Sequence, residues 1–186
     1  MSTIPVPRRV AAREVGRCVV SSLVMLGRRE VCQPRVHVGR RIHFADGTSA
    51  RVYRETAAFR TPHDPCVLIV SFRLRGVSSP GAHALFRAES VLNTPLFIGF
   101  PGFVSKLWLA DDDHGTYRGL YEWDGARAAE HYSRCLWRVL ELVSVVGSMD
   151  YRVIPGRRRD EVLDDPTLLQ GYAPTEVDAW WRVLAA

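Results

Sequence analysis

The chain contains almost no lysine. Of its 25 basic residues only Lys106 is a lysine, and the others are arginines. The chain also lacks the motifs G-x-G-x-x-G, G-x-S-x-G and H-E-x-x-H, and it has no phosphate-binding loop. These motifs carry dinucleotide binding, acyl transfer, zinc hydrolysis and nucleotide binding. The sequence therefore gives no standard signature for any of those chemistries.

Long hydrophobic runs are also missing. The longest near the N-terminus, residues 18–26, is interrupted by two serines and is too short to span a bilayer. Its basic flank contains Glu14, and no A-x-A cleavage site follows it. The four cysteines are scattered without a C-x-x-C pair, and three have apolar neighbours, as buried free thiols do. We expect a cytoplasmic protein with no membrane partner.

The formal net charge is +5, and the arginines fall in short clusters. None of these clusters has the interleaved aromatic residues or the motif of a nucleic-acid-binding surface. Solvated surface is the better interpretation, so no nucleic-acid partner is expected.

The central segment, residues 103–124, has the pattern of two strands joined by a tight turn. The sequence Asp111-Asp112-Asp113-His114-Gly115 has the residue types of a turn, and apolar residues occupy both faces of the first strand. Three aspartates in a row are also compatible with a metal site, but a solvated turn is the commoner meaning of such a cluster. The hairpin needs cover on both faces.

The flanking segments divide the chain into three parts: a 1–60 extension, a 66–155 domain and a 156–186 tail. The spacing of apolar residues predicts a helix from Arg9 to about Glu30, and a β-hairpin is expected over 35–57. His37 and His43 fall on the polar face of that hairpin and are expected at the surface. The tail is expected to be a loop to about Pro174, followed by a helix over 176–184.

Residues 66–154 follow the order β-α-β-β-α-β, with helices over 81–92 and 125–143. This is the order of a ferredoxin-like α+β sandwich, with both helices on one sheet face. Apolar residues on both faces of strands 66–74 and 103–110 then need another sheet. A second copy is the commonest source, so we expect a homodimer.

The run PGFVSKLWLADDDHGTYRGLYEWDG, followed by AAEHYSRCLW and SMDYRVIPG, resembles the YdhR-like monooxygenases. These are dimeric α+β barrels related to the antibiotic-biosynthesis monooxygenases. The most characteristic parts are K-x-W (Lys106, Trp108) and R-G-x-Y (Arg118, Gly119, Tyr121), and the resemblance covers about residues 66–155. It implies a pocket between sheet and helices. Some members oxidise aromatic polyketides without metal or flavin, while others degrade haem, isomerise or cyclise small molecules.

Aromatic residues on elements that pack together in this fold predict a pocket for a flat hydrophobic substrate. Gly119 removes a side chain in mid-strand and would leave room for a ligand. The expected substrate-binding residues are Phe86, Trp108, Gly119 and Trp123. The candidates for a base, hydrogen-bond donor or anion-stabilising cation are His83, Tyr121, Tyr132, Lys106 and Arg118. No metal or cofactor is expected.

Three functions stay open at this point. The first is a cofactor-independent monooxygenase acting on an aromatic or polyketide-like compound. The second is a proton-transfer isomerase or cyclase, and the third is a non-catalytic dimeric binding protein. A separate structural hypothesis packs Trp137, which lies off the apolar stripe of its helix, against Trp180 and Trp181 of the tail.

Overall fold

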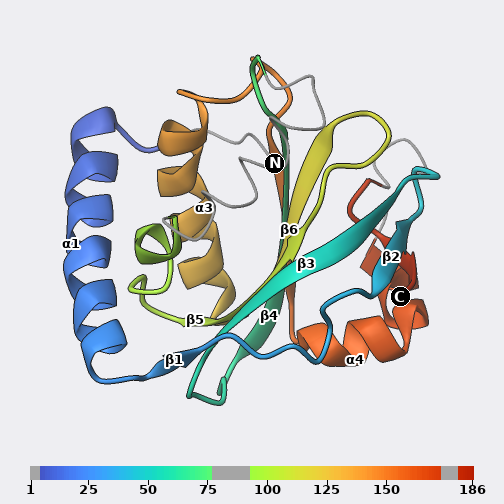
Figure 1. The fold of residues 1–186 in the computed structure, drawn as a ribbon, viewed down its shortest axis with the longest axis horizontal. Coiled ribbons are helices and arrows are strands. Elements are labelled where there is room, and N and C mark those ends of the chain that lie inside the picture. Colours follow the sequence, from blue (N-terminus) through green and yellow to red (C-terminus); the bar gives the residue numbers. More distant parts are fainter. Residues whose placement is uncertain (1–4, 77–92, 173–179) are drawn as a thin grey trace.

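The computed structural model describes residues 5–76, 93–172 and 180–186. Its central feature is a curled antiparallel sheet (Figure 1). The described strands follow the order β7-β4-β6-β5-β3-β2-β8, with the short β1 paired to β3. Helices α1 and α3 lie to one side of this sheet, and α4 with the C-terminus lies on the other (Figure 1).

The middle of the sheet is formed by β4 (Pro65–Arg73), β5 (Phe103–Leu109), β6 (Thr116–Asp124) and β7 (Asp150–Pro155). The hairpin predicted over 103–124 is present, and every residue of β5 is buried. The order β7-β4-β6-β5 and the antiparallel pairings are consistent with a ferredoxin-like fold. The expected helix at 81–92 lies outside the described residues.

Helix α3 (Ala126–Leu140) covers one face of this sheet because its apolar residues recur at helical spacing. Ala129, Tyr132 and Cys135 are its fully buried apolar residues. Helix α1 (Arg8–Gly27) begins and ends close to the predicted bounds. It packs against α3 and against η1 (Thr94–Leu96), as the outermost layer on that side (Figure 1).

The N-terminal hairpin widens the sheet. β2 (Arg41–Phe44) and β3 (Ser49–Ala58) flank the predicted turn, and β3 pairs along β5. β1 (Val31–Cys32) pairs with the end of β3. The predicted first strand was too long, because residues 35–40 are irregular and only 41–44 are extended in the ladder.

The tail covers the second face of the sheet. α4 (Arg159–Asp164), η2 (Pro166–Tyr172) and β8 (Val183–Ala185) follow β7, and β8 pairs with β2. The loop expected up to Pro174 is therefore wrong over 159–172. The helix expected over 176–184 is wrong at its end, where Val183 begins a strand, while 176–179 lie outside the described residues.

A single chain thus supplies the cover that the sequence assigned to a second copy. The apolar group on this face comprises Ile42, Phe44, Ala50, Val52, Val67, Ile69, Leu107, Leu109, Leu120, Ile154, Val162, Leu163, Leu169, Trp181 and Val183. Each is at most 2% exposed. The bare face that motivated a homodimer is therefore filled within the chain, and a homodimer stays a prediction without that support.

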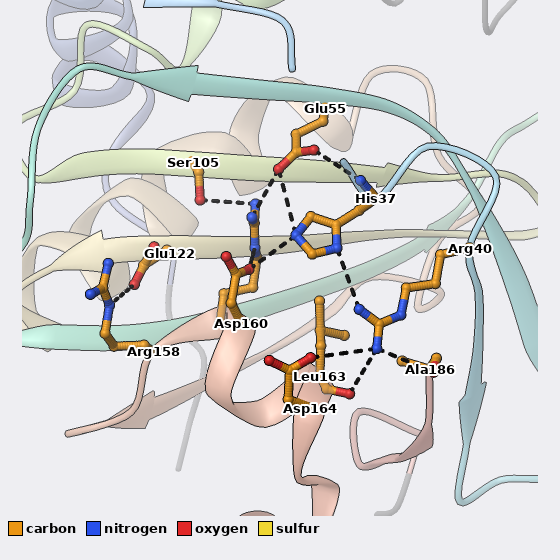
Figure 2. A network of polar contacts seen from close by, with 11 residues as sticks. His37, Arg40, Glu55, Ser105, Glu122, Arg158, Asp160, Leu163, Asp164 and Ala186 are labelled. Atoms are coloured by element: carbon orange, nitrogen blue, oxygen red, sulfur yellow. Dashed lines mark hydrogen bonds and ion pairs between the residues drawn. The ribbon is translucent and has the colours of Figure 1, made fainter. Parts of the chain in front are cut away.

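A buried ion network holds the tail to the sheet (Figure 2). Arg159 is 4% exposed; its guanidinium lies 2.9 Å from Glu55 Oε1 and donates to Ser105 Oγ at 3.0 Å. The Nε2 atom of His37 lies 3.3 Å from Asp160 Oδ1. His37 is 7% exposed, so the surface position expected for it is wrong: it lies in the irregular stretch before β2 and packs against α4. His43 is exposed, as predicted.

The proposed packing of Trp137 against the tail tryptophans is also wrong. The Trp137 ring meets that of Tyr151 edge-on, with centroids 6.4 Å apart, at the α3 side of the sheet. Trp181 is buried in the apolar group on the opposite face. The tail has the structural role that was expected of it, through different contacts. Within the described ranges, no helix has the length and apolarity needed to cross a bilayer.

Candidate functional site

A cavity of about 650 Å³ lies between the sheet and α3. Lys106 and Trp108 of β5, Tyr121 of β6 and Tyr132 of α3 contribute to its wall. The other described lining residues are Phe72, Leu74, Arg75, Asn93, Leu96, Phe97, Leu136, Val139, Leu140, Leu142 and Val143. This volume falls within the range of small-molecule sites, which are mostly apolar with a few placed polar groups.

The chain's one lysine lies in this wall. Lys106 is 7% exposed, and its Nζ lies 3.1 Å from the centroid of the Trp108 ring. The rings of Phe97 and Tyr121 lie 4.6 and 4.8 Å from the same atom. Among the described residues, no acidic side chain forms an ion pair with Lys106. Within the described part of the chain, the amine is therefore held by aromatic faces.

The environment of Lys106 favours its neutral form. Burial lowers its pKa well below the ordinary 10.5, and the nearby Arg54 guanidinium lowers it further. Aromatic faces attract an ammonium and oppose this shift, but such contacts contribute only about 0.5–2 kcal/mol. Because no carboxylate of the described residues compensates, desolvation dominates. A neutral amine facing a cavity can act as a base or a nucleophile.

Two phenols complete the polar side of the cavity. Tyr132 donates a hydrogen bond from its hydroxyl to that of Tyr121, at 3.3 Å. Burial raises the pKa of both above the ordinary value of 10.0, so both remain neutral donors at physiological pH. Because Tyr121 accepts from Tyr132, its own proton is available to an acceptor in the cavity.

Gly119 makes room for Tyr121 and not for a ligand. A Cβ at Gly119 would lie 2.6 Å from Cε2 of the Tyr121 ring and 3.0 Å from its hydroxyl oxygen. The absent side chain therefore lets this ring lie flat along β6. Across the ladder Gly119 pairs with Trp108, whose indole Nε1 donates to Thr56 Oγ1 at 3.2 Å. The pairing register of β5 and β6 thus fixes the positions of the Trp108 and Tyr121 rings relative to each other.

Trp123 and Arg118, which the sequence also assigned to the site, do not line the cavity. Trp123 is fully buried behind Tyr132, with ring centroids 4.7 Å apart, and supports that residue without lining the cavity. Arg118 faces the opposite side of β6, where it pairs with Asp112 at 2.7 Å and Asp46 at 2.8 Å. This places Arg118 outside the cavity, since neighbours along a strand face opposite sides. His83 and Phe86 lie outside the described residues.

Asp112 shows why the acidic turn has a structural role. Its Oδ1 accepts the backbone N–H groups of His114 and Thr116, each at 2.9 Å, and its Oδ2 pairs with Arg118. It is 8% exposed, so one of the three aspartates expected in solvent is buried. In the described part of the chain no three His, Cys, Asp or Glu residues cluster as metal ligands would.

Sequence reasoning missed Phe97 and Arg54. Phe97 belongs to the apolar connector 96–102, which gave no periodic signal, yet its ring contacts Trp108 edge-on at 5.3 Å. The Arg54 guanidinium carbon lies 4.2 Å from the Trp108 centroid, beside Lys106. The register of β3 on β5, which the hairpin prediction did not give, brings Arg54 opposite Trp108.

Helix α1 holds this connector in place. The Ser22 hydroxyl donates to Pro95 O at 2.8 Å and accepts from the Gly99 N–H at 2.9 Å. A Cβ at Gly99 would lie 2.2 Å from Cys18 O, so only glycine allows this approach. The N-terminal helix therefore positions the cavity wall that carries Phe97.

Comparisons with known proteins add little. No family model matches the chain, and no curated protein matches it. Among solved structures, the chain is similar to an uncharacterized ferredoxin-fold protein from Listeria monocytogenes, described as related to antibiotic biosynthesis monooxygenases. The likeness has a TM-score of 0.40 and 14% identity, and covers 59% of this chain and 64% of that one. The functional proposal therefore depends on the cavity.

Proposed function

We propose that the chain is a small-molecule enzyme that binds a flat aromatic or polyketide-like compound and removes a proton from it with the neutral amine of Lys106. The observation that carries this proposal is the buried amine, without an acidic partner among the described residues, on the wall of an aromatic cavity. In a dry site a neutral amine is a stronger base than water, and the proton it accepts leaves an ammonium beside the new anion.

The phenols of Tyr121 and Tyr132 supply the hydrogen bond that stabilises the anion formed by the base. Tyr121 has a proton to donate, and Tyr132 orients it, so an enolate or phenolate oxygen in the cavity gains a neutral hydrogen bond as charge develops. The solvent-exposed part of the wall suits an apolar compound, because Val143 and Leu142 there are 48% and 76% exposed.

Dioxygen is the proposed acceptor of the anion's electrons, which makes the activity that of a cofactor-independent monooxygenase. A substrate CH₂ group and O₂ give C=O and water, so the substrate supplies the electrons and both hydrogens. The resemblance of the central hairpin to the monooxygenases favours this outcome. In the isomerase or cyclase outcome the anion is instead reprotonated or closes a ring.

Two assays test the proposal. 5-Nitrobenzisoxazole is a flat compound whose ring opens to a coloured phenolate when a base removes its carbon-bound proton. We expect turnover that rises with pH and levels off well below pH 10.5, and a fall of about 10²-fold or more in Lys106→Met. Equal turnover in wild type and Lys106→Met would refute the role of the amine.

Oxygen uptake with 2-tetralone, a flat ketone with an acidic CH₂, separates the outcomes. Uptake that needs Lys106 supports the monooxygenase. Deuterium exchange at that CH₂ without oxygen uptake would refute the monooxygenase and support the proton-transfer isomerase or cyclase.

A further inference from the structure

Lys106 has a second chemistry that proton transfer does not use. A neutral amine is a nucleophile toward carbonyl carbon as well as a base, and lysines of this kind form imines. Three features of the cavity bear on this: the position of Nζ, the donor beside it and the apolar walls.

The position of Nζ leaves it open to attack a ligand. Among the described residues its neighbours are the faces of Trp108, Phe97 and Tyr121, and a ring face is not a hydrogen-bond donor that would occupy the lone pair. The ion network on the other sheet face gives the contrast. There Arg159 pairs with Glu55, and Arg158 lies 3.0 Å from Glu122. The fold neutralises those cations with carboxylates and leaves Lys106 without one among the described residues.

The donor is Tyr121, whose ring lies 4.8 Å from Nζ and whose hydroxyl proton is free of its bond with Tyr132. Imine formation needs an acid at the carbonyl oxygen. The acid first protonates this oxygen as the amine attacks the carbon, and it then helps the oxygen to leave as water. The apolar walls favour loss of that water and protect the imine from hydrolysis.

We infer that the cavity takes a hydrophobic aldehyde or ketone and binds it covalently as an imine on Lys106. This inference rests on the proposed binding of a flat hydrophobic compound in the same cavity. The Nζ–C bond forms as the carbonyl π bond breaks, giving a carbinolamine. The C–O bond then breaks, and the oxygen leaves as water with the two hydrogens of the amine. No oxidant or reductant is consumed.

The single lysine makes the test specific. The full chain is incubated at pH 7 with 2-naphthaldehyde and sodium cyanoborohydride, which reduces an imine to a stable secondary amine. The added mass is that of the aldehyde less one oxygen, and peptide mass spectrometry locates it. Only two primary amines compete: Lys106 and the α-amino group.

The α-amino group is the internal reference. At pH 7 an ordinary lysine is only about 0.04% neutral, whereas an α-amine is about 10% neutral, so unfolded protein should react at its N-terminus. In the folded chain we expect at least a tenfold preference for Lys106, reversed in urea and slowed by the carbonyl-free competitor 2-methylnaphthalene. Tyr121→Phe should slow labelling several-fold, and Lys106→Arg should abolish it at that position.

Preferential labelling of the α-amine in the folded chain would overturn the inference, and so would labelling of Lys106 that the competitor does not slow. The two proposals fail separately. 2-Naphthaldehyde has no hydrogen on the carbon beside its carbonyl for a base to remove, and 5-nitrobenzisoxazole has no carbonyl. Ring opening without labelling would leave Lys106 a base only.

Discussion

At the scale of single residues, the structure keeps Lys106 at a cost in stability. A buried amine without a carboxylate partner is destabilising, and exchange for an apolar side chain of similar length removes that cost. Function and stability therefore oppose each other at this position.

We expect Lys106→Met to have a free energy of unfolding about 1–3 kcal/mol higher than that of wild type at pH 7, and so to unfold at a higher denaturant concentration. The pKa of Lys106 is lower in the folded than in the unfolded chain, so between those two pKa values the unfolded chain binds more protons and wild-type stability rises with pH. The advantage of Lys106→Met should therefore be full below the folded pKa and vanish near pH 10.5. Urea titrations at several pH values measure it, and a less stable Lys106→Met would contradict this account.

Gly119 provides a second test at this scale. In Gly119→Ala the new methyl group overlaps the Tyr121 ring, which must tilt into the cavity. We expect a loss of about 1–3 kcal/mol in stability together with slower turnover of 5-nitrobenzisoxazole.

The matched control is Gly16→Ala, since a Cβ there meets nothing within 4 Å. In α1 this change should stabilise the chain by about 0.5–1 kcal/mol and leave turnover unchanged. Similar turnover in Gly119→Ala and Gly16→Ala would show that turnover does not depend on the position of the Tyr121 ring.

At the scale of elements, α4 depends on a buried ion pair. Removing Arg159 leaves Glu55, itself 3% exposed, without its strongest partner. We expect Arg159→Met to cost about 3–5 kcal/mol, the usual range for breaking a buried pair. The exposed Arg28→Met should cost less than about 0.5 kcal/mol. Thermal or urea unfolding measures both.

A double variant sharpens this experiment. Glu55→Gln with Arg159→Met removes both charges, so its cost should be smaller than the sum of the two single costs. Additive costs, or an Arg159→Met as mild as Arg28→Met, would mean that the network does not hold α4.

The sequence predicted elements best where periodicity was strong. α1, α3 and the hairpin of β5 and β6 were found because their apolar residues repeat at helical or strand spacing. α4 was missed because its six residues are mostly charged and its helix is stabilised by tertiary contacts. The register that brings Arg54 to Trp108, and the place of His37, depend on pairing and packing that no local pattern encodes.

At the scale of the whole molecule, the two sheet faces have different tasks. One face is filled by the tail and the N-terminal hairpin, and the other carries the cavity under α3. The sequence placed Lys106, Trp108 and Tyr121 together because of alternation along β5 and β6, and it placed Tyr132 with them because of the helical spacing of apolar residues in α3. Arg118 was included for its charge and its place in R-G-x-Y, although the same alternation puts it on the face of β6 opposite Tyr121, where it pairs with Asp112.

The central claim is that the cavity lowers the pKa of the Lys106 amine and so favours its neutral form. Because the chain has one lysine, labelling lysine with ¹³C at Cε gives a single resonance, and its shift against pH reports the pKa of Lys106 directly. The account requires a midpoint well below 10.5 in the folded chain and a return to the ordinary value in urea. A folded-state midpoint at or above 10.5 would mean a lysine charged throughout, and would contradict both the proposed base and the proposed imine.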